Sequence, residues 1–384
     1  MEIYFDNAAT TRPFPEVMEE MTKVALNDYG NPSSKHMKGV EAENHIRRAK
    51  EIIASAVKCK EKEIVFTSGA TESNNRAIFG GVRAKKRAGK HIITSAMEHP
   101  SVREPFLRLE QEGYDVTFLP VDKRGIVDLQ ELRNSLREDT VLVSVMHVNN
   151  ETGIIEPVKE IGEIIKEYNQ DIYFHVDAVQ AFGKVEVIPK NIKADLLSVS
   201  AHKFHGPKGT GFLYIRDGVR ILPLLEGGGQ QNKLRSGTEN VPGIAGMGKA
   251  VEMIAREYAE KKEELKALRE YFISGLSGIE GVTVNGGGPD VQSPHIVSAT
   301  VDGIRSEVLL HALEEKGIFV SSGSACSSNK PGLSFVLTAM GLSGEAADST
   351  IRFSFSYSST KEEADICTDA LKELVPTLRM FVRK

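Results

Sequence analysis

A lysine and an aspartate follow two successive apolar segments in the middle of the chain. Asp177 ends the segment IYFHVD, and Lys203 comes shortly after the segment LLSVS. Pyridoxal phosphate chemistry requires both side chains, because a lysine amine binds the cofactor covalently and a carboxylate keeps its pyridine nitrogen protonated. An aspartate at a strand end is otherwise most often a turn former or a helix cap. The pair favours pyridoxal phosphate over that plainer interpretation.

The same cofactor needs a cradle for its phosphate group, and the segment SGATES at 68–73 is a candidate. It joins an expected strand to an expected helix, where backbone N–H groups and the helix dipole attract an anion. On this segment alone, ordinary capping of the helix by Ser68 or Thr71 is the simpler interpretation.

Polar side chains follow other apolar segments as well. His99 comes after HIITS, Asn150 comes after VLVSVM, and Gln180 lies just beyond Asp177. Because ligands of open α/β sheets gather at the carboxyl ends of the strands, these groups should meet with Ser200 at one edge. Any one of them is as easily structural, so their convergence is the stronger signal.

His202 and His205 are spaced closely enough to suggest a metal pair. No third ligand is near them in sequence, and the intervening Lys203 would repel a cation. We therefore predict no metal site at this position.

Cys326 is the cysteine whose surroundings favour reactivity. It lies among small residues in SSGSACSS at 321–328, a composition that predicts an exposed and mobile loop. Cys59 and Cys367 fit ordinary surface or packing positions. The odd and sparse count of three cysteines fits a reducing cytosol better than a disulfide framework.

The elements that must position these residues alternate as strands and helices, the pattern of a mostly parallel sheet with helices on both faces. We expect strands at 63–68, 91–95, 115–120, 141–146, 172–177, 196–200 and 209–215, and helices at 71–88, 101–112, 128–137 and 157–169. The gap before the last strand is too short for a crossover helix, so that strand should be antiparallel.

A long amphipathic helix is expected over 241–276, followed by a smaller α+β domain. Its strands are expected at 282–286, 295–301, 317–323 and 350–356, and its helices near 305–316, 334–341 and 360–380. We expect a large cofactor-binding α/β domain at 15–257, with 1–14 and 258–384 forming the smaller domain that carries the Cys326 loop.

The composition of the 384 residues, 40% hydrophobic and 26% charged, is that of a soluble globular protein. The net charge of −5 does not favour binding to nucleic acid or to anionic membranes, and no apolar run is long enough to span a bilayer. We expect a cytoplasmic protein whose partners are small molecules or proteins.

Together these motifs resemble the NifS/IscS-like cysteine desulfurases of the class V aminotransferase family. The resemblance spans nearly the whole chain through YFDNAATT at 4–11, GNPSS at 30–34, TSGATESNN at 67–75, MEH at 97–99, HVNNETG at 147–153, DAVQ at 177–180, SAHKFHGPKG at 200–209, RSGTEN at 235–240 and SGSACSS at 322–328. It implies a homodimeric fold-type I enzyme dependent on pyridoxal 5'-phosphate. Such an enzyme converts L-cysteine to L-alanine and leaves the sulfur on its own cysteine as a persulfide.

The resemblance also implies roles for individual residues. Lys203 would hold the cofactor and move protons, Asp177 would pair with the pyridine nitrogen, and His99 would stack on the ring and accept a thiol proton. The other cofactor contacts would come from Ala70, Thr71, Asn150, Gln180, Ser200, His202 and, from the other subunit, Thr238.

For the substrate, Arg352 would bind the carboxylate, assisted by Asn31 and Asn150. Cys326 would attack the substrate sulfur and deliver it to an acceptor or iron–sulfur scaffold protein, and it is also a candidate ligand for a transferred cluster. The alternatives are a selenocysteine lyase, another pyridoxal-phosphate-dependent β-lyase, or a non-catalytic cofactor-binding assembly scaffold.

Overall fold

The computed structural model describes residues 2–322 and 333–381. In these ranges the largest sheet has seven strands, all of them expected from the sequence. Their order across the sheet is β2 (Ile64–Thr67), β8 (Gly211–Ile215), β7 (Leu196–Ser200), β6 (Tyr173–Asp177), β5 (Thr140–Met146), β3 (His91–Ser95) and β4 (Asp115–Leu119). The strands from β7 to β4 run parallel, while β8 is antiparallel to both of its neighbours, as predicted.

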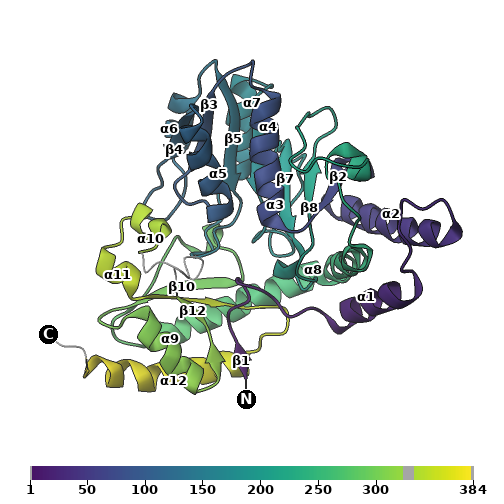
Figure 1. Ribbon diagram of the computed structural model, residues 1–384. Coiled ribbons are helices and arrows are strands. Elements are labelled where there is room, and N and C mark those ends of the chain that lie inside the picture. Colours follow the sequence, from purple (N-terminus) through teal and green to yellow (C-terminus); the bar gives the residue numbers. More distant parts are fainter. Residues whose placement is uncertain (1, 323–332, 382–384) are drawn as a thin grey trace.

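Helices cover both faces of this sheet (Figure 1), so its central strands are buried throughout and consist of nearly continuous apolar runs. The covering helices are α3 (Ala70–Asn75), α4 (Gly81–Ala84), α5 (Pro100–Gln111), α6 (Leu129–Ser135) and α7 (Val158–Tyr168). The single helix expected at 71–88 is interrupted by the π-helical turn η2 (Arg76–Gly80). This wider turn accompanies the burial of Arg76, whose Nε pairs with Glu72 at 2.7 Å.

Two N-terminal helices, α1 (Pro15–Asn27) and α2 (Met37–Val57), pack against the long helix α8 (Val241–Leu276). Close packing depends on glycines of α8. A Cβ at Gly246 would lie 2.5 Å from Met21 Cγ, and one at Gly248 would lie 3.0 Å from Ala49 Cβ.

The smaller part of the chain has an antiparallel sheet in the order β12 (Ser321–Ser322), β13 (Thr350–Ser354), β10 (Ile296–Val301) and β9 (Val282–Val284). Its helices are α9 (Ser306–Glu315), α10 (Phe335–Ala339), α11 (Gly344–Asp348) and α12 (Lys361–Arg379). The strand expected at 317–323 is divided, because β11 (Ile318–Phe319) pairs with β1 (Ile3–Tyr4) and β12 pairs with β13.

Short 3-10 helices occur in both parts of the chain. They are η1 (Glu61–Glu63), η3 (Ala201–Lys203), η4 (Gln230–Lys233) and η5 (Pro289–Val291).

Two hydrophobic cores meet along α8. Within α8, the residues in the core of the large sheet extend to Ile254, and those from Leu265 onward belong to the core of the small sheet, together with Ile3 and Phe5. We propose on this basis that a domain boundary falls within α8, with 15–257 on one side and 1–14 plus 258–384 on the other. Among the described residues, no helix has the length and apolarity needed to cross a bilayer.

Candidate active site

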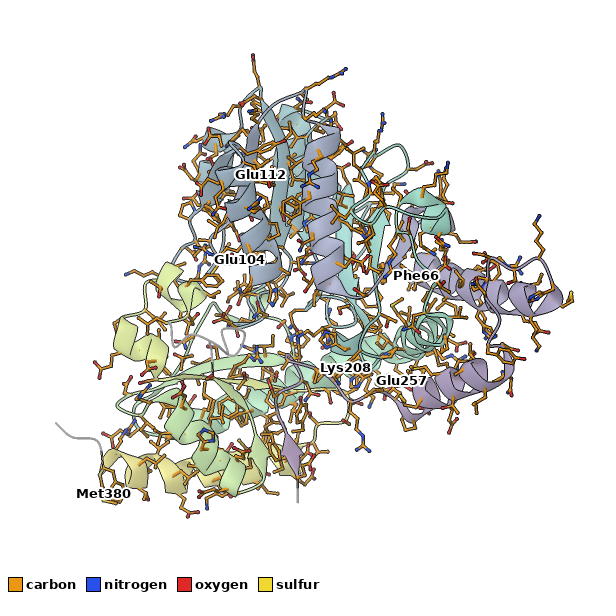
Figure 2. All side chains as sticks on the ribbon, viewed as in Figure 1. Phe66, Glu104, Glu112, Lys208, Glu257 and Met380 are labelled. Carbon is orange, nitrogen blue, oxygen red and sulfur yellow. The ribbon has the colours of Figure 1, made fainter. Side chains whose placement is uncertain are left out.

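A cavity of about 510 Å³ opens where the carboxyl ends of the large sheet meet the N-terminal segment and β13. Residues expected at the site from sequence meet here: Ala70, Thr71, His99, Asn150, Asp177, Gln180, Ser200, His202, Lys203 and Arg352. Lys208, labelled in Figure 2, lines the same cavity. The predicted convergence of strand-end side chains is therefore present.

Two expected residues that the structure describes do not line this cavity. Asn31 is exposed and accepts a hydrogen bond from the Ser33 backbone at 2.9 Å. Thr238 is also exposed on this chain. Cys326 lies outside the described residues, and neither of the other two cysteines, Cys59 and Cys367, lines the cavity. Burial raises the pKa of the Cys59 thiol to about 12, and Cys367 packs in the small core.

Asp177 ends β6 and is 4% exposed. Its Oδ2 accepts a hydrogen bond from Asn74 Nδ2 at 2.7 Å, and its Oδ1 accepts one from the Val179 backbone at 3.0 Å. Since both carboxylate oxygens have a donor, the plane of the group is fixed. Asp177 can therefore present a fixed negative charge at this end of the cavity.

His99 belongs to the same hydrogen-bond network. Asn74 Nδ2 also donates to Ser101 Oγ at 2.9 Å, and Ser101 approaches His99 Nδ1 with its hydroxyl at 2.8 Å and its backbone N–H at 3.1 Å. Because Nδ1 accepts that backbone N–H, the neutral ring carries its proton on Nε2. Burial lowers the pKa of His99, with the Lys203 charge adding to the effect and Asp177 opposing it. In this state Nε2 is a donor. His99 can therefore accept a thiol proton at Nε2, as predicted, only after Nε2 has lost the proton that it already carries.

Lys203 ends the short turn η3 and reaches across to the N-terminal segment. Its Nζ donates to the Ala8 and Ala9 carbonyls at 2.6 and 2.7 Å, and Gln180 Nε2 donates to the Ala8 carbonyl at 2.8 Å. Behind it, the buried Lys184 amine donates to the Lys203 backbone carbonyl. Burial and the Lys203 charge lower the pKa of Lys184 to about 7.

A tight loop around Gly69 lines another part of the cavity. Gly69 has φ +143°, and a Cβ there would lie 3.3 Å from Ser200 Oγ. Gly211, which begins β8 beside this loop, has no room for a Cβ, because Gly69 Cα would be 2.8 Å away. The start of α3, including Thr71, lines the cavity together with Ser200.

His202 adds a neutral ring to this cradle. Its Nδ1 lies 3.2 Å from Thr10 Oγ1, and burial, followed by the charges of Lys203, Lys208 and Lys184, lowers its pKa to about 4. Hydroxyls, N–H groups and cationic lysines suit a phosphate, while Asp177 and Lys203 suit a pyridine nitrogen and an aldehyde. The residues present therefore fit pyridoxal phosphate.

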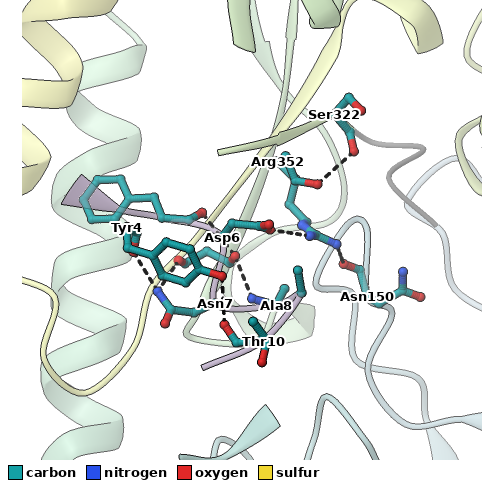
Figure 3. A network of polar contacts seen from close by, with 12 residues as sticks. Tyr4, Asp6, Asn7, Ala8, Thr10, Asn150, Ser322 and Arg352 are labelled. Atoms are coloured by element: carbon teal, nitrogen blue, oxygen red, sulfur yellow. Dashed lines mark hydrogen bonds and ion pairs between the residues drawn. The ribbon is translucent and has the colours of Figure 1, made fainter. Parts of the chain in front are cut away.

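Arg352 projects from β13 and is 3% exposed. Its Nη1 donates to the Asn150 carbonyl at 2.8 Å, and its Nη2 pairs with Asp6 Oδ1 at 2.7 Å (Figure 3). A buried guanidinium lining a cavity is suited to binding a carboxylate.

Sequence reasoning did not find Asn74, Ser101, Asp6 or Lys184. Asn74 and Asp6 stand inside the motifs TSGATESNN and YFDNAATT, so position within a motif was the available signal. Ser101 and Lys184 follow His99 and the DAVQ segment closely, but their residue types gave no indication of a role.

Comparisons with known proteins find relatives over nearly the whole chain. The family model for aminotransferase class-V matches residues 3–367. Cysteine desulfurase IscS of Dictyoglomus turgidum is 47% identical over 379 residues, which are 98% of this chain and 95% of the relative. Cysteine desulfurase IscS of Methanosarcina thermophila is 48% identical over 98% of this chain and 93% of the relative. A solved NifS-like protein matches with a TM-score of 0.93 at 40% identity, covering 98% of this chain and 100% of that one.

Proposed function

This chain belongs to the aminotransferase class-V family, and from that premise we propose that it is a cysteine desulfurase dependent on pyridoxal 5'-phosphate. The reaction converts L-cysteine to L-alanine and passes the sulfur on as a persulfide. The observation that carries the proposal is the cavity that joins Lys203, Asp177, His99 and Arg352. The predicted fold-type I architecture is in keeping with the 0.93 TM-score to the NifS-like structure.

Lys203, Asp177 and Arg352 each have a task that follows from position. Lys203 binds the cofactor and carries protons at the reacting carbons, Asp177 faces the pyridine nitrogen, and the loop from Gly69 to Thr71 holds the phosphate with Ser200 and His202. Arg352 binds the carboxylate of the amino acid. When bound, the cofactor supplies an electron sink that weakens the bond between Cβ and sulfur.

Cys326 completes the reaction in this proposal. Its thiolate attacks the sulfur of the substrate, so that an S–S bond forms and the Cβ–S bond breaks. The electron pair of the broken bond stays with the carbon fragment, which takes up a proton and leaves as alanine. A thiol acceptor then regenerates Cys326 by attack on the persulfide.

We further propose that the protein is a homodimer in the cytoplasm. Its substrate is L-cysteine, and its partner is a sulfur-acceptor or iron–sulfur scaffold protein. The exposure of Thr238 supports a contact across the dimer, because this residue is absent from the cavity of its own chain. Asn31 is also exposed, and its role stays an expectation from resemblance.

The decisive experiment is incubation of the holoenzyme with L-cysteine, with alanine quantified and the persulfide located by mass spectrometry. We expect equal amounts of alanine and transferred sulfur, with the first sulfur on Cys326. Cys326→Ser should keep the cofactor absorbance and lose sulfur transfer, whereas Cys59→Ser should retain both. Alanine formed without persulfide on Cys326 would favour a β-lyase, and bound cofactor with no alanine would favour a non-catalytic scaffold.

A further inference from the structure

Asp6 and Arg352 form a partly buried ion pair beside the cavity. Asp6 Oδ1 lies 2.7 Å from Arg352 Nη2, and the two side chains are 22% and 3% exposed. Arg352 lines the cavity, whereas Asp6 does not. The aspartate therefore contacts the guanidinium from outside the space that a ligand would fill.

The backbone on both sides of Asp6 is fixed to the strand that carries Arg352. Ser354 N donates to the Phe5 carbonyl at 2.6 Å, and Asn7 N donates to the Ser354 carbonyl at 3.3 Å. Asp6 itself forms a bridge with Ser354. Since Ser354 and Arg352 belong to the same strand β13, the carboxylate and the guanidinium are held in one rigid unit.

The second contact of Arg352 fixes its other side. Nη1 donates to the carbonyl of Asn150, a residue that follows β5 and lines the cavity. Figure 3 shows the guanidinium between Asp6 and Asn150. Its Nε has no hydrogen-bond partner among the described residues. Two of the guanidinium nitrogens are thus anchored, and the plane of the group is set.

We infer that Asp6 is a positioning residue, which orients Arg352 so that Arg352 can bind the carboxylate of the substrate. Oδ1 fixes Nη2 so that the remaining N–H groups of the guanidinium are oriented for one carboxylate of an α-amino acid. A fixed fork binds a carboxylate better than a mobile one, because less rotational freedom is lost on binding. This inference rests on the proposed function, in which Arg352 binds the carboxylate of cysteine.

Two other roles for Asp6 make different predictions. A purely structural counter-charge would neutralise the buried guanidinium, and its removal would lower thermal stability without regard to the ligand. A competitor would occupy Arg352 until substrate displaced it, and its removal would tighten substrate binding. Positioning predicts weaker binding that is confined to ligands with a carboxylate.

The test compares Asp6→Ala and Asp6→Asn in the holoenzyme, with Asp348→Ala as the matched control. Asp348 pairs with Arg305 at 3.0 Å on the surface, away from the cavity. For Asp6→Ala we expect KM for L-cysteine to rise about tenfold with kcat within about twofold. Asp6→Asn keeps an acceptor oxygen, so its KM should stay within about threefold of the wild-type value.

A binding measurement gives a readout that does not depend on turnover. L-alanine and ethylamine differ by the carboxylate alone, and both can be titrated against the cofactor absorbance. Asp6→Ala should weaken L-alanine about tenfold and leave ethylamine unchanged, and it should add no further loss in an Arg352→Gln background.

A fall in KM for Asp6→Ala, equal losses in the alanine and asparagine variants, or the same loss for ethylamine as for L-alanine would each overturn the inference. Failure of the wild-type enzyme to form alanine from cysteine would instead reject the proposed function. The comparison of L-alanine with ethylamine would still decide whether Asp6 acts on carboxylate ligands.

Discussion

The carboxylate of Asp177 accepts a hydrogen bond from the amide of Asn74 at 2.7 Å, although the two residues are 103 positions apart. The same amide nitrogen contacts Ser101 Oγ at 2.9 Å, which in turn lies 2.8 Å from His99 Nδ1. One buried amide therefore orients both the acid proposed to face the pyridine nitrogen and the ring proposed to stack on it.

Asn74→Leu should weaken cofactor binding by about tenfold or more, because Asp177 Oδ2 would lose its donor while remaining buried. The dissociation constant for pyridoxal phosphate, measured by fluorescence or absorbance, checks this. Asn134→Leu is the control, since Asn134 is exposed and contacts Gln130 on α6. Unchanged cofactor affinity in Asn74→Leu would remove Asn74 from the site.

Borohydride reduction of the holoenzyme should attach the cofactor to Lys203 alone. Lys184 is the critical comparison, because its pKa is lowered to about 7 and its amine is partly neutral at physiological pH. It is nevertheless buried, donates to the Lys203 carbonyl and does not line the cavity. Peptide mapping of wild type and Lys203→Ala should find no cofactor on Lys184, and a label there would show that pKa rather than position selects the lysine.

The central strands of the large sheet were predictable from sequence because they are buried on both faces, so β5 and β6 appear as largely apolar runs. Asp177 and Lys203 were found for the same reason, since Asp177 ends one such run and Lys203 lies shortly beyond β7. Their surroundings were not predictable in this way. Asp6 and Arg352 are 346 positions apart, and no local pattern indicates which distant side chain will meet a buried charge.

The same limit explains the errors in the fold. The run at 317–323 has one apolar pattern, but its two halves pair with different strands, β1 and β13. The short helix α11 has five residues and a serine cap, too little periodicity for recognition. No element was predicted over α1 and α2, whose burial depends on contact with α8, far along the chain.

Gly69→Ala should lower the affinity for the cofactor in addition to lowering the stability of the fold. The substitution adds a side chain at φ +143° and places its Cβ 3.3 Å from Ser200 Oγ, inside the proposed phosphate cradle. Gly113→Ala is the matched control, because Gly113 has φ +86° with nothing within 4 Å of its added Cβ. Both variants should lose about 1 to 2 kcal/mol of stability through backbone strain.

The two glycine variants should differ in cofactor affinity, which we expect to fall about tenfold or more in Gly69→Ala alone. Thermal unfolding of the apoenzymes and titration with pyridoxal phosphate separate the two effects. Equal affinities in both variants would contradict the assignment of the loop from Gly69 to Thr71 to the phosphate.

Glu156 should make the stability of the protein depend on pH. Its side chain is 2% exposed, Oε2 accepts a hydrogen bond from the Val127 backbone at 2.9 Å, and Oε1 has no partner among the described residues. Burial, with a smaller contribution from the Asp122 charge, raises the pKa of Glu156 from 4.5 to about 8. The folded protein therefore holds this proton over a range of pH in which the unfolded chain has released it.

The sign of the effect follows from proton linkage. The stabilisation associated with Glu156 is complete below pH 4.5 and is lost as pH rises through about 8, at roughly 1 kcal/mol per pH unit. Glu156→Gln mimics the protonated acid and keeps an acceptor for Val127, so its urea midpoint should exceed that of wild type by a margin that grows over this range. Glu167→Gln, at a side chain that is 81% exposed, should follow wild type throughout. Parallel pH profiles for wild type and Glu156→Gln would mean that the carboxyl is charged in the folded protein.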